Sequence, residues 1–212
     1  MVDERDWIKH TVAVDDFTID VGYLIAKEFY FGDPNDWAEI DSGRNRISLY
    51  RPALTTPGNV VLVSAIDQTV DELIVYYNDV LANVRRHRKD IKQCLHYFWI
   101  RPYIIYADNA VCCPWYDRYH EVERFLSALR SIEGDGDIYW DRDQSWELSV
   151  VAEGDRVHIR EWDPDDEVER VCIHCSLAKV WQKSEDMLTK TSSLMDQLKS
   201  VFGEDYWSMK NY

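Results

Sequence analysis

The feature that most constrains the fold is a change of hydrophobic period between residues 138 and 202. Short segments in which apolar and polar residues alternate, the pattern of half-buried strands, precede one long segment with apolar residues every three or four positions. The predicted strands are 138–140, 146–152, 157–162 and 168–175, and the predicted helix is 177–202 with Gly203 as its stop. This order predicts a four-stranded antiparallel meander covered by one helix, which is an α+β arrangement.

The first 132 residues predict a second α+β half. Predicted strands at 7–14, 17–31, 47–50 and 60–65 favour an antiparallel sheet, and apolar residues at helical spacing predict helices at 69–88 and about 114–132. Residues 91–106 are a dense aromatic block that stays unassigned, because Pro102 argues against one continuous helix. Glycines at 134 and 136 separate residues 1–132 from residues 133–212, and we expect the two halves to pack together as one globular unit.

The charge of the chain is strongly negative and unevenly placed. With 39 acidic and 24 basic residues among 212, the formal net charge is −15. Residues 133–169 alone contain 14 acidic and 3 basic residues, a net of −11. Such a charge repels phosphate backbones and anionic membranes and attracts basic partners, so we expect neither a nucleic acid nor a membrane as the partner. The alternative is that the charge only serves solubility.

The location predicted from the sequence is cytoplasmic. No stretch reaches the roughly 18 uninterrupted apolar residues of a membrane span, and the first residues contain no apolar run typical of a signal peptide. The five cysteines are an odd number, which favours reduced thiols over a disulfide framework.

Sequence motifs of catalysis are not apparent. The eight glycines are scattered, and neither a phosphate-binding loop, a dinucleotide-binding fingerprint nor a nucleophile elbow occurs, so no cofactor is expected. A triad assembled in space stays open, because triads are recognised by geometry rather than by order. The basic run 85–89 is interpreted as the end of a helix that complements its own dipole rather than as a nucleic-acid patch.

A metal site is the strongest chemical alternative. Cys172, His174 and Cys175, with His158 on the neighbouring predicted strand, supply the ligand types that zinc favours. Alternation along a strand, however, puts Cys172 and His174 on one face and Cys175 on the other. A second cysteine pair is represented only by the adjacent Cys112-Cys113. Buried thiols are therefore the preferred interpretation.

Tryptophans interleaved with carboxylates mark the predicted partner-binding surface. Aromatic anchors surrounded by charge are typical of protein interfaces, and acidic charge suits a basic partner. The alternatives are that the tryptophans belong to the core, or that the carboxylates hold a divalent cation, although the twelve-residue order of an EF-hand is missing. The predicted partner-binding residues are Trp140, Asp141, Asp143, Trp162, Asp163, Asp165, Asp166 and Glu167.

The acidic, aromatic segment DIYWDRDQSWELSVVAEGDRVHIREWDPDD and the overall character of the chain resemble the immunity proteins of bacterial polymorphic or contact-dependent toxin systems. Such proteins bind a cognate toxin, often a basic nuclease, and occlude its active site. The resemblance therefore implies a basic toxin domain as partner and no enzymatic activity. A phage-type inhibitor or nucleic-acid mimic, and an enzyme with an unrecognised metal-dependent site, remain as alternatives.

Overall fold

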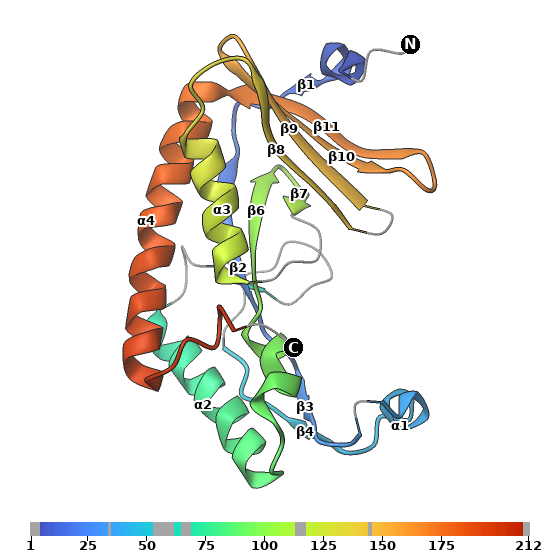
Figure 1. Cartoon of the computed structure of the whole chain (residues 1–212), viewed down its shortest axis with the longest axis vertical. Helices are drawn as coiled ribbons and strands as arrows, with labels where there is room; N and C mark the ends of the chain where they lie inside the picture. The colour runs from blue at the N-terminus through green and yellow to red at the C-terminus, as the bar shows by residue number, and fades with distance from the viewer. Residues whose placement is uncertain are drawn as a thin grey trace.

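The computed structural model describes residues 5–33, 35–52, 62–64, 69–112, 118–143 and 146–209, with only the backbone for 62–64, Cys112 and Asp143. It confirms an α+β architecture of mostly antiparallel sheets with helices packed against them. Figure 1 shows an elongated molecule in which one long helix runs along a side and spans both sheets.

The C-terminal meander is confirmed. Its strands are β8 (Gly136–Asp143), β9 (Trp146–Glu153), β10 (Arg156–Asp163) and β11 (Val168–Ser176), each antiparallel to the next. The β9–β10 hairpin turns at Gly154, whose φ of 60° lies in the left-handed region that glycine adopts without strain. Helix α4 (Leu177–Phe202) follows directly and ends at Gly203, with a φ of 71°. A left-handed glycine ends the helix as predicted.

The prediction of a strand over residues 7–14 is wrong for its first half. Residues Asp6–His10 form the 3₁₀ helix η1, and only β1 (Val12–Ala13) is extended. β1 pairs in parallel with β11 and becomes the fifth strand of the C-terminal sheet. The reason is tertiary, because the Trp7 ring of η1 packs edge-on against His158 of β10, with 6.5 Å between centroids.

The N-terminal sheet has the order β5-β2-β6-β7, with every neighbouring pair antiparallel. Its strands are β5 (Leu62–Ser64), β2 (Thr18–Leu24), β6 (Ile100–Tyr106) and β7 (Asn109–Cys112). The predicted strand 17–31 divides into β2 and β3 (Glu28–Tyr30), and β3 pairs with β4 (Arg46–Ser48) around α1 (Trp37–Asp41). The predicted strand 60–65 extends beyond the described residues at both ends.

The unassigned aromatic block contains two elements, the 3₁₀ helix η2 (Ile91–Phe98) and strand β6. Pro102 lies inside β6, where it pairs with Val21 of β2. Proline has no N–H to donate and is normally confined to strand edges. The described pairing between β6 and β7 begins only at Tyr103, so the sheet does not require a donor from Pro102 on that side.

The halves on either side of residue 132 interlock. Helix α4 contacts α2 (Val70–Arg86), α3 (Tyr119–Arg130) and strand β2, while β1 completes the C-terminal sheet. After α4 the chain returns to the N-terminal half, where the buried Trp207 ring meets the Tyr77 ring edge-on at 5.0 Å. Both α2 and α3 confirm predicted helices, although residues 114–117 of the predicted 114–132 span lie outside the description.

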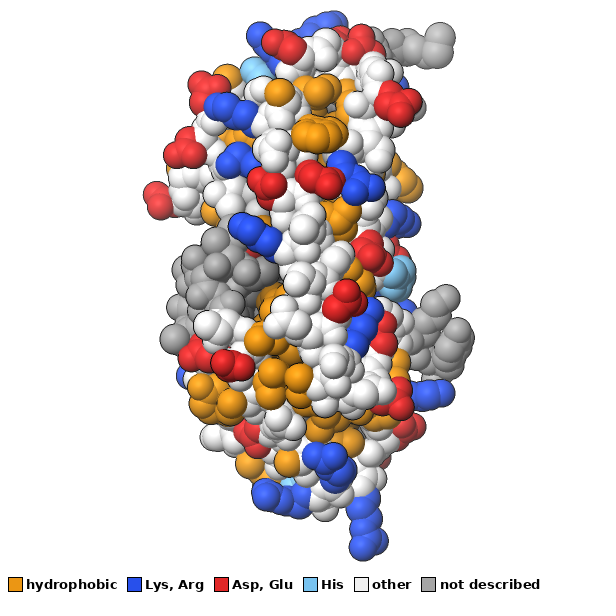
Figure 2. Space-filling model, turned by 90° about the vertical axis from the view of Figure 1, so that its left-hand side faces the viewer, with side chains coloured by type: hydrophobic (Ala, Val, Ile, Leu, Met, Phe, Trp, Pro, Cys, Tyr) orange, Lys and Arg blue, Asp and Glu red, His pale blue; other side chains and the backbone are white. Residues whose placement is uncertain are grey.

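The face that α4 presents to solvent carries charges of both signs. Figure 2 shows acidic and basic side chains interspersed along it, with apolar side chains gathered towards the end where α2 lies. Among the described residues, no helix combines the length and the apolar character that crossing a bilayer requires.

Candidate binding surface

Alternation along β8 to β11 divides the predicted surface residues between two faces. We call the face that α3 and α4 contact the inner face, and the opposite face, beside η1, the outer face. The register places on the inner face Tyr139, Asp141, Trp146, Leu148, Val150, Ile159, Glu161, Asp163 and Ile173. It places on the outer face Trp140, Glu147, Ser149, His158, Arg160, Trp162, Cys172 and His174.

The two predicted anchor tryptophans both lie on the outer face. Trp140 of β8 is 61% exposed, which is unusual for so large an apolar side chain. Trp162 of β10 is half-buried because the Arg160 guanidinium covers its ring, 4.3 Å from the centroid. Trp140 is therefore the more accessible anchor.

Two of the predicted carboxylates lie on the inner face instead. Asp141 is 9% exposed and accepts a hydrogen bond from the Tyr139 hydroxyl at 3.2 Å. Burial raises the pKa of Asp141. Asp163 is 3% exposed, and its carboxylate pairs with Arg170 at 2.8 Å, whose hydrogen bond holds the pKa of Asp163 below its usual range. These carboxylates organise the sheet and are not at the surface that a partner would meet.

The β10–β11 turn supplies the exposed carboxylates of the predicted set. Asp165, Asp166 and Glu167 are all exposed there. Backbone N–H groups of Asp165 and Asp166 donate to Asp163 Oδ1 at 3.2 and 3.3 Å, so the buried carboxylate shapes the turn that presents the others. The backbone of Asp143 ends β8, and its side chain lies outside the description.

Glu161 is a buried acid that the sequence interpretation did not single out. Its side chain is 5% exposed on the inner face, opposite Leu148, and its Oε2 atom has no hydrogen-bond partner among the described residues. Burial raises its pKa to about 7, and the nearby Arg170 partly opposes that effect. Strict alternation from Ile159 through Asp163 was the signal that could have placed it inside.

The candidate zinc ligands do not converge. Cys172 and His174 lie on the outer face and Cys175 lies buried on the other, as alternation predicts. Within the part of the chain that the structure describes, no group of three or more His, Cys, Asp or Glu side chains is placed to hold a metal ion. Burial raises the pKa of Cys172 to about 11 and that of Cys175 to about 12, which keeps the thiols protonated. The second pair, Cys112-Cys113, lies outside the described side chains.

The two histidines of that set bind a protein hydroxyl. His158 and His174 face each other in register with 5.4 Å between ring centroids, and both Nδ1 atoms lie about 3 Å from Thr11 Oγ1, at 3.0 and 3.1 Å. Because the Thr11 hydroxyl donates its one hydrogen to the Ile8 carbonyl at 2.8 Å, it accepts from both rings. The pair therefore fixes the N-terminal segment to the sheet. Burial lowers the pKa of His158, and electrostatic repulsion from His174 lowers it further.

The outer face is hollowed between Trp140 and η1. The groove has a volume of about 740 Å³ and lies over β8, β9 and β10. Its lining residues are Arg5, Asp6, Trp7, Asp137, Tyr139, Trp140, Glu147, Ser149, Val150, Val151 and Arg160. Trp7, Glu147 and Ser149 were not singled out from the sequence, because the groove exists only when η1 is placed beside the sheet.

A second exposed tryptophan lies at the end of the β3–α1–β4 arm, residues 28–48, which projects from the molecule (Figure 1). Trp37 in α1 is 74% exposed. Two nearby carboxylates accept hydrogen bonds from the backbone: Asp36 from the Glu39 N–H at 3.0 Å, and Asp33 from the Asn35 N–H at 2.9 Å. Asp41, one helical turn after Trp37, is also exposed. The arm therefore displays an aromatic ring with an exposed carboxylate on the same short helix, and the outer face differs from it by the groove beside Trp140.

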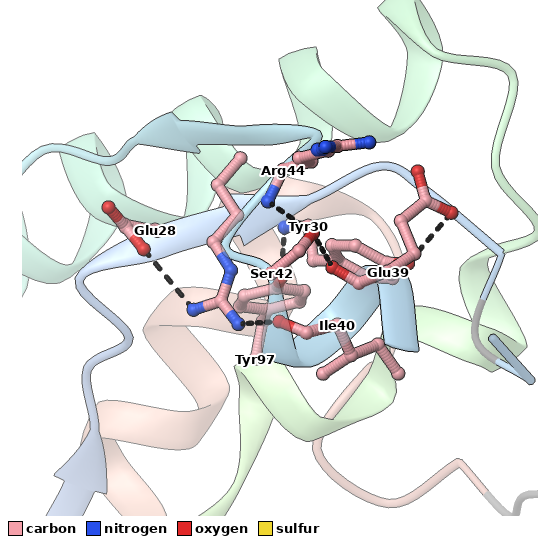
Figure 3. Close-up of polar contacts among 8 residues, drawn as sticks. Glu28, Tyr30, Glu39, Ile40, Ser42, Arg44 and Tyr97 are labelled. Carbon is pink, nitrogen blue, oxygen red and sulfur yellow. Dashed lines mark hydrogen bonds and ion pairs between the residues drawn. The ribbon is translucent and has the colours of Figure 1, made fainter. Parts of the chain in front are cut away.

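Hydrogen bonds within the arm hold it in shape (Figure 3). The Tyr30 N–H donates to the Tyr97 hydroxyl at 2.8 Å, which ties the arm to η2. The Tyr30 hydroxyl approaches Glu39 Oε2 at 3.3 Å, and Ser42 Oγ donates to the Glu39 carbonyl at 2.7 Å. These contacts stabilise the conformation of the arm, and they do not indicate a binding site.

No protein-family model matches the chain, and no similar curated protein or solved structure was found.

Proposed function

We propose that this protein is an acidic binding protein that neutralises a cognate basic toxin or nuclease by occluding it. The observation that carries the proposal is the exposed Trp140, which borders a groove on the outer face of the β8–β11 sheet. The β10–β11 turn of the same sheet adds the exposed carboxylates Asp165, Asp166 and Glu167. Exposed aromatic anchors with surrounding charge favour protein partners, and acidic charge favours basic ones. The proposal places the protein in the cytoplasm, with no catalytic role.

The overall charge supports the same proposal. A net charge of −15 steers a basic polypeptide towards the molecule over distances of about a Debye length. Two of the predicted carboxylates, Asp141 and Asp163, are removed from the proposed contact surface because they are buried. The side chain of Asp143 is outside the described part of the structure, and the described residues that remain in the surface set are Trp140, Trp162, Asp165, Asp166 and Glu167.

The test is capture of the partner followed by a toxicity assay. The full chain, immobilised, should retain a basic polypeptide from extracts of its native cell at low salt and release it as salt rises. That polypeptide, identified by mass spectrometry, should arrest growth when produced alone and become harmless when produced with this chain. Retention of a polypeptide that is harmless on its own would refute neutralisation, and retention of no basic polypeptide would refute the partner class.

A Trp140→Ala variant sharpens the test. It should reduce both retention and rescue, while the Trp37→Ala variant, which removes an even more exposed ring from the arm, should leave both unchanged. Equal loss in the two variants would show that the proposed contact surface is wrong.

A further inference from the structure

The groove on the outer face follows from side-chain size along one row of the sheet. The register aligns Trp140 of β8, Ser149 of β9 and Arg160 of β10 side by side. Ser149 is small and its neighbours are large, so a depression is left between them, and Trp7 of η1 forms part of its lining. Strands lie about 4.8 Å apart, so a gap spanning β8 to β10 is wide enough for one planar side chain.

The described part of the molecule repeatedly combines an aromatic ring, an arginine and a carboxylate. On the outer face Arg160 lies 4.3 Å from the Trp162 centroid and 3.3 Å from Glu169. On the inner face Arg170 lies 5.4 Å from the Trp146 centroid and 2.8 Å from Asp163. A planar guanidinium can stack on an aromatic face and still donate to a carboxylate, which makes this combination favourable.

Trp140 and Glu147 are an aromatic ring and a carboxylate of the same kind, but among the described residues no arginine stacks on Trp140 or forms an ion pair with Glu147. They are near neighbours on the outer face, since Trp140 pairs with Ser149 and Arg142 with Glu147. The Ser149 hydroxyl donates to Glu147 Oε1 at 3.2 Å. Among the described residues no Lys or Arg forms an ion pair with Glu147, even though Arg142 lies opposite it in register.

The other acids that line the groove have partners. Glu147 is therefore the lining carboxylate whose charge a ligand could neutralise. The ion pairs at and beside the groove are Arg5–Asp137 at 2.8 Å, Lys9–Asp6 at 2.6 Å and Arg160–Glu169 at 3.3 Å.

We propose that this groove takes one arginine side chain of the basic polypeptide, its guanidinium stacked on Trp140 and paired with Glu147. The proposal rests on the proposed function for the presence of a basic polypeptide, and it names the residue type that the groove selects. Arginine fits better than lysine, because its flat guanidinium can stack and form an ion pair at once, whereas an ammonium is a compact, strongly hydrated charge.

The experiment is a titration of the full chain with the probe acetyl-Gly-Gly-Arg-Gly-Gly-amide, read through the indole N–H signals of the tryptophans by NMR. The Trp140 signal, assigned from a Trp140→Phe variant, should shift in a saturable manner. The same peptide with citrulline, which keeps the shape of arginine without its charge, should give no saturable shift, and the lysine peptide a weaker one.

Variants locate the counter-charge. Glu147→Gln should weaken binding of the arginine probe about threefold, the size expected of one exposed ion pair. Glu133→Gln removes the same charge from an exposed residue preceding β8 and should leave the affinity unchanged. Arg142→Ala removes a competing cation opposite Glu147 and should strengthen binding. The proposed arginine binding would be refuted by equal shifts with the citrulline peptide, or by an equal loss of affinity for the arginine probe in Glu147→Gln and Glu133→Gln.

The outcomes separate this inference from the proposed function. If the groove variants have no effect while the native basic polypeptide still binds and is neutralised, the arginine groove is wrong and the proposed function stands. If the arginine probe binds as described but no toxic basic polypeptide is retained from the native cell, the proposed function is wrong and the arginine specificity of the groove stands.

Discussion

The two faces of the β8–β11 sheet carry similar side chains with opposite consequences. On the inner face Asp141, Glu161 and Asp163 are buried, so their charge states affect the stability of the fold. On the outer face Trp140 is exposed beside Glu147 and a groove. A cluster of tryptophans and carboxylates in the sequence is thus divided by the period of the strand.

The difference teaches that acidic composition alone does not define a binding surface. Asp163 pairs with Arg170 and shapes the β10–β11 turn, whereas Asp165 and Asp166 of the same turn are exposed. Acidic residues that are close in the sequence therefore differ in role, because one stabilises the turn and the others are exposed to solvent. The first two of the following predictions test a stability role of the inner face and a binding role of the outer face, and the other two test the β10–β11 turn and the metal alternative.

The largest expected effect is the pH dependence of stability due to Glu161. Its folded pKa of about 7 lies above its ordinary value of 4.5, so the folded protein binds more protons in that interval and loses stability as pH rises through it. The free energy of unfolding of the Glu161→Gln variant, relative to that of the wild type, should therefore increase by about 2 kcal/mol between pH 5 and pH 8. Urea unfolding at both values measures this. Parallel pH profiles with equal m-values would contradict it.

The next effect concerns the anchor of the outer face. Trp140→Ala should weaken binding of the retained basic polypeptide about tenfold, mainly through faster dissociation, because truncation of a central aromatic anchor costs on the order of 1–2 kcal/mol. Trp37→Ala is the control on the arm and should change the affinity less than about twofold. Surface plasmon resonance measures both rates. A larger loss in Trp37→Ala would move the interface to the arm.

A smaller effect is expected from the exposed carboxylates. Charge reversal of Asp165 and Asp166 to lysine should slow association several-fold at low salt and leave dissociation nearly unchanged, because peripheral charges act mainly on the encounter rate. Reversal of Asp41 and Glu204, which are also exposed, changes the net charge equally. If both pairs slow association to the same extent, steering comes from net charge and not from the β10–β11 turn.

The smallest effect is expected from zinc. Since Cys172 and Cys175 lie on opposite faces and their pKa values are raised, added zinc should shift the melting temperature by less than about 1 °C, and the purified protein should carry no stoichiometric metal by elemental analysis. A stoichiometric metal lost in a Cys172→Ser variant would restore the metal-dependent alternative.

The fold was predictable where a local pattern and the tertiary structure agree. The meander and α4 were predicted because period two, period 3.6 and the glycines at 154 and 203 all indicate the same elements. The N-terminal segment was not, because η1 and the parallel pairing of β1 depend on β11, which lies about 160 residues later in the chain (Val12 pairs with Ile173).

The candidate site was predictable only in part. Trp140 and the acidic turn were identified from composition and strand ends, whereas Asp141 and Asp163 were assigned to the surface although alternation turns them inward. Glu147 and Ser149 gave no sequence signal of their own. They matter because a small residue lies between Trp140 and Arg160 in the assembled sheet.

The sequence by itself determined the α+β class, the order of the C-terminal strands and helix, and the concentration of negative charge in residues 133–169, because these depend on local periodicity and composition. The tertiary structure alone decided which carboxylates are buried, where the groove lies and which of its carboxylates has no ion-pair partner among the described residues. The physical reason is that burial and charge pairing depend on neighbours brought from distant parts of the chain, such as Trp7 beside β10 and Arg170 beside Trp146.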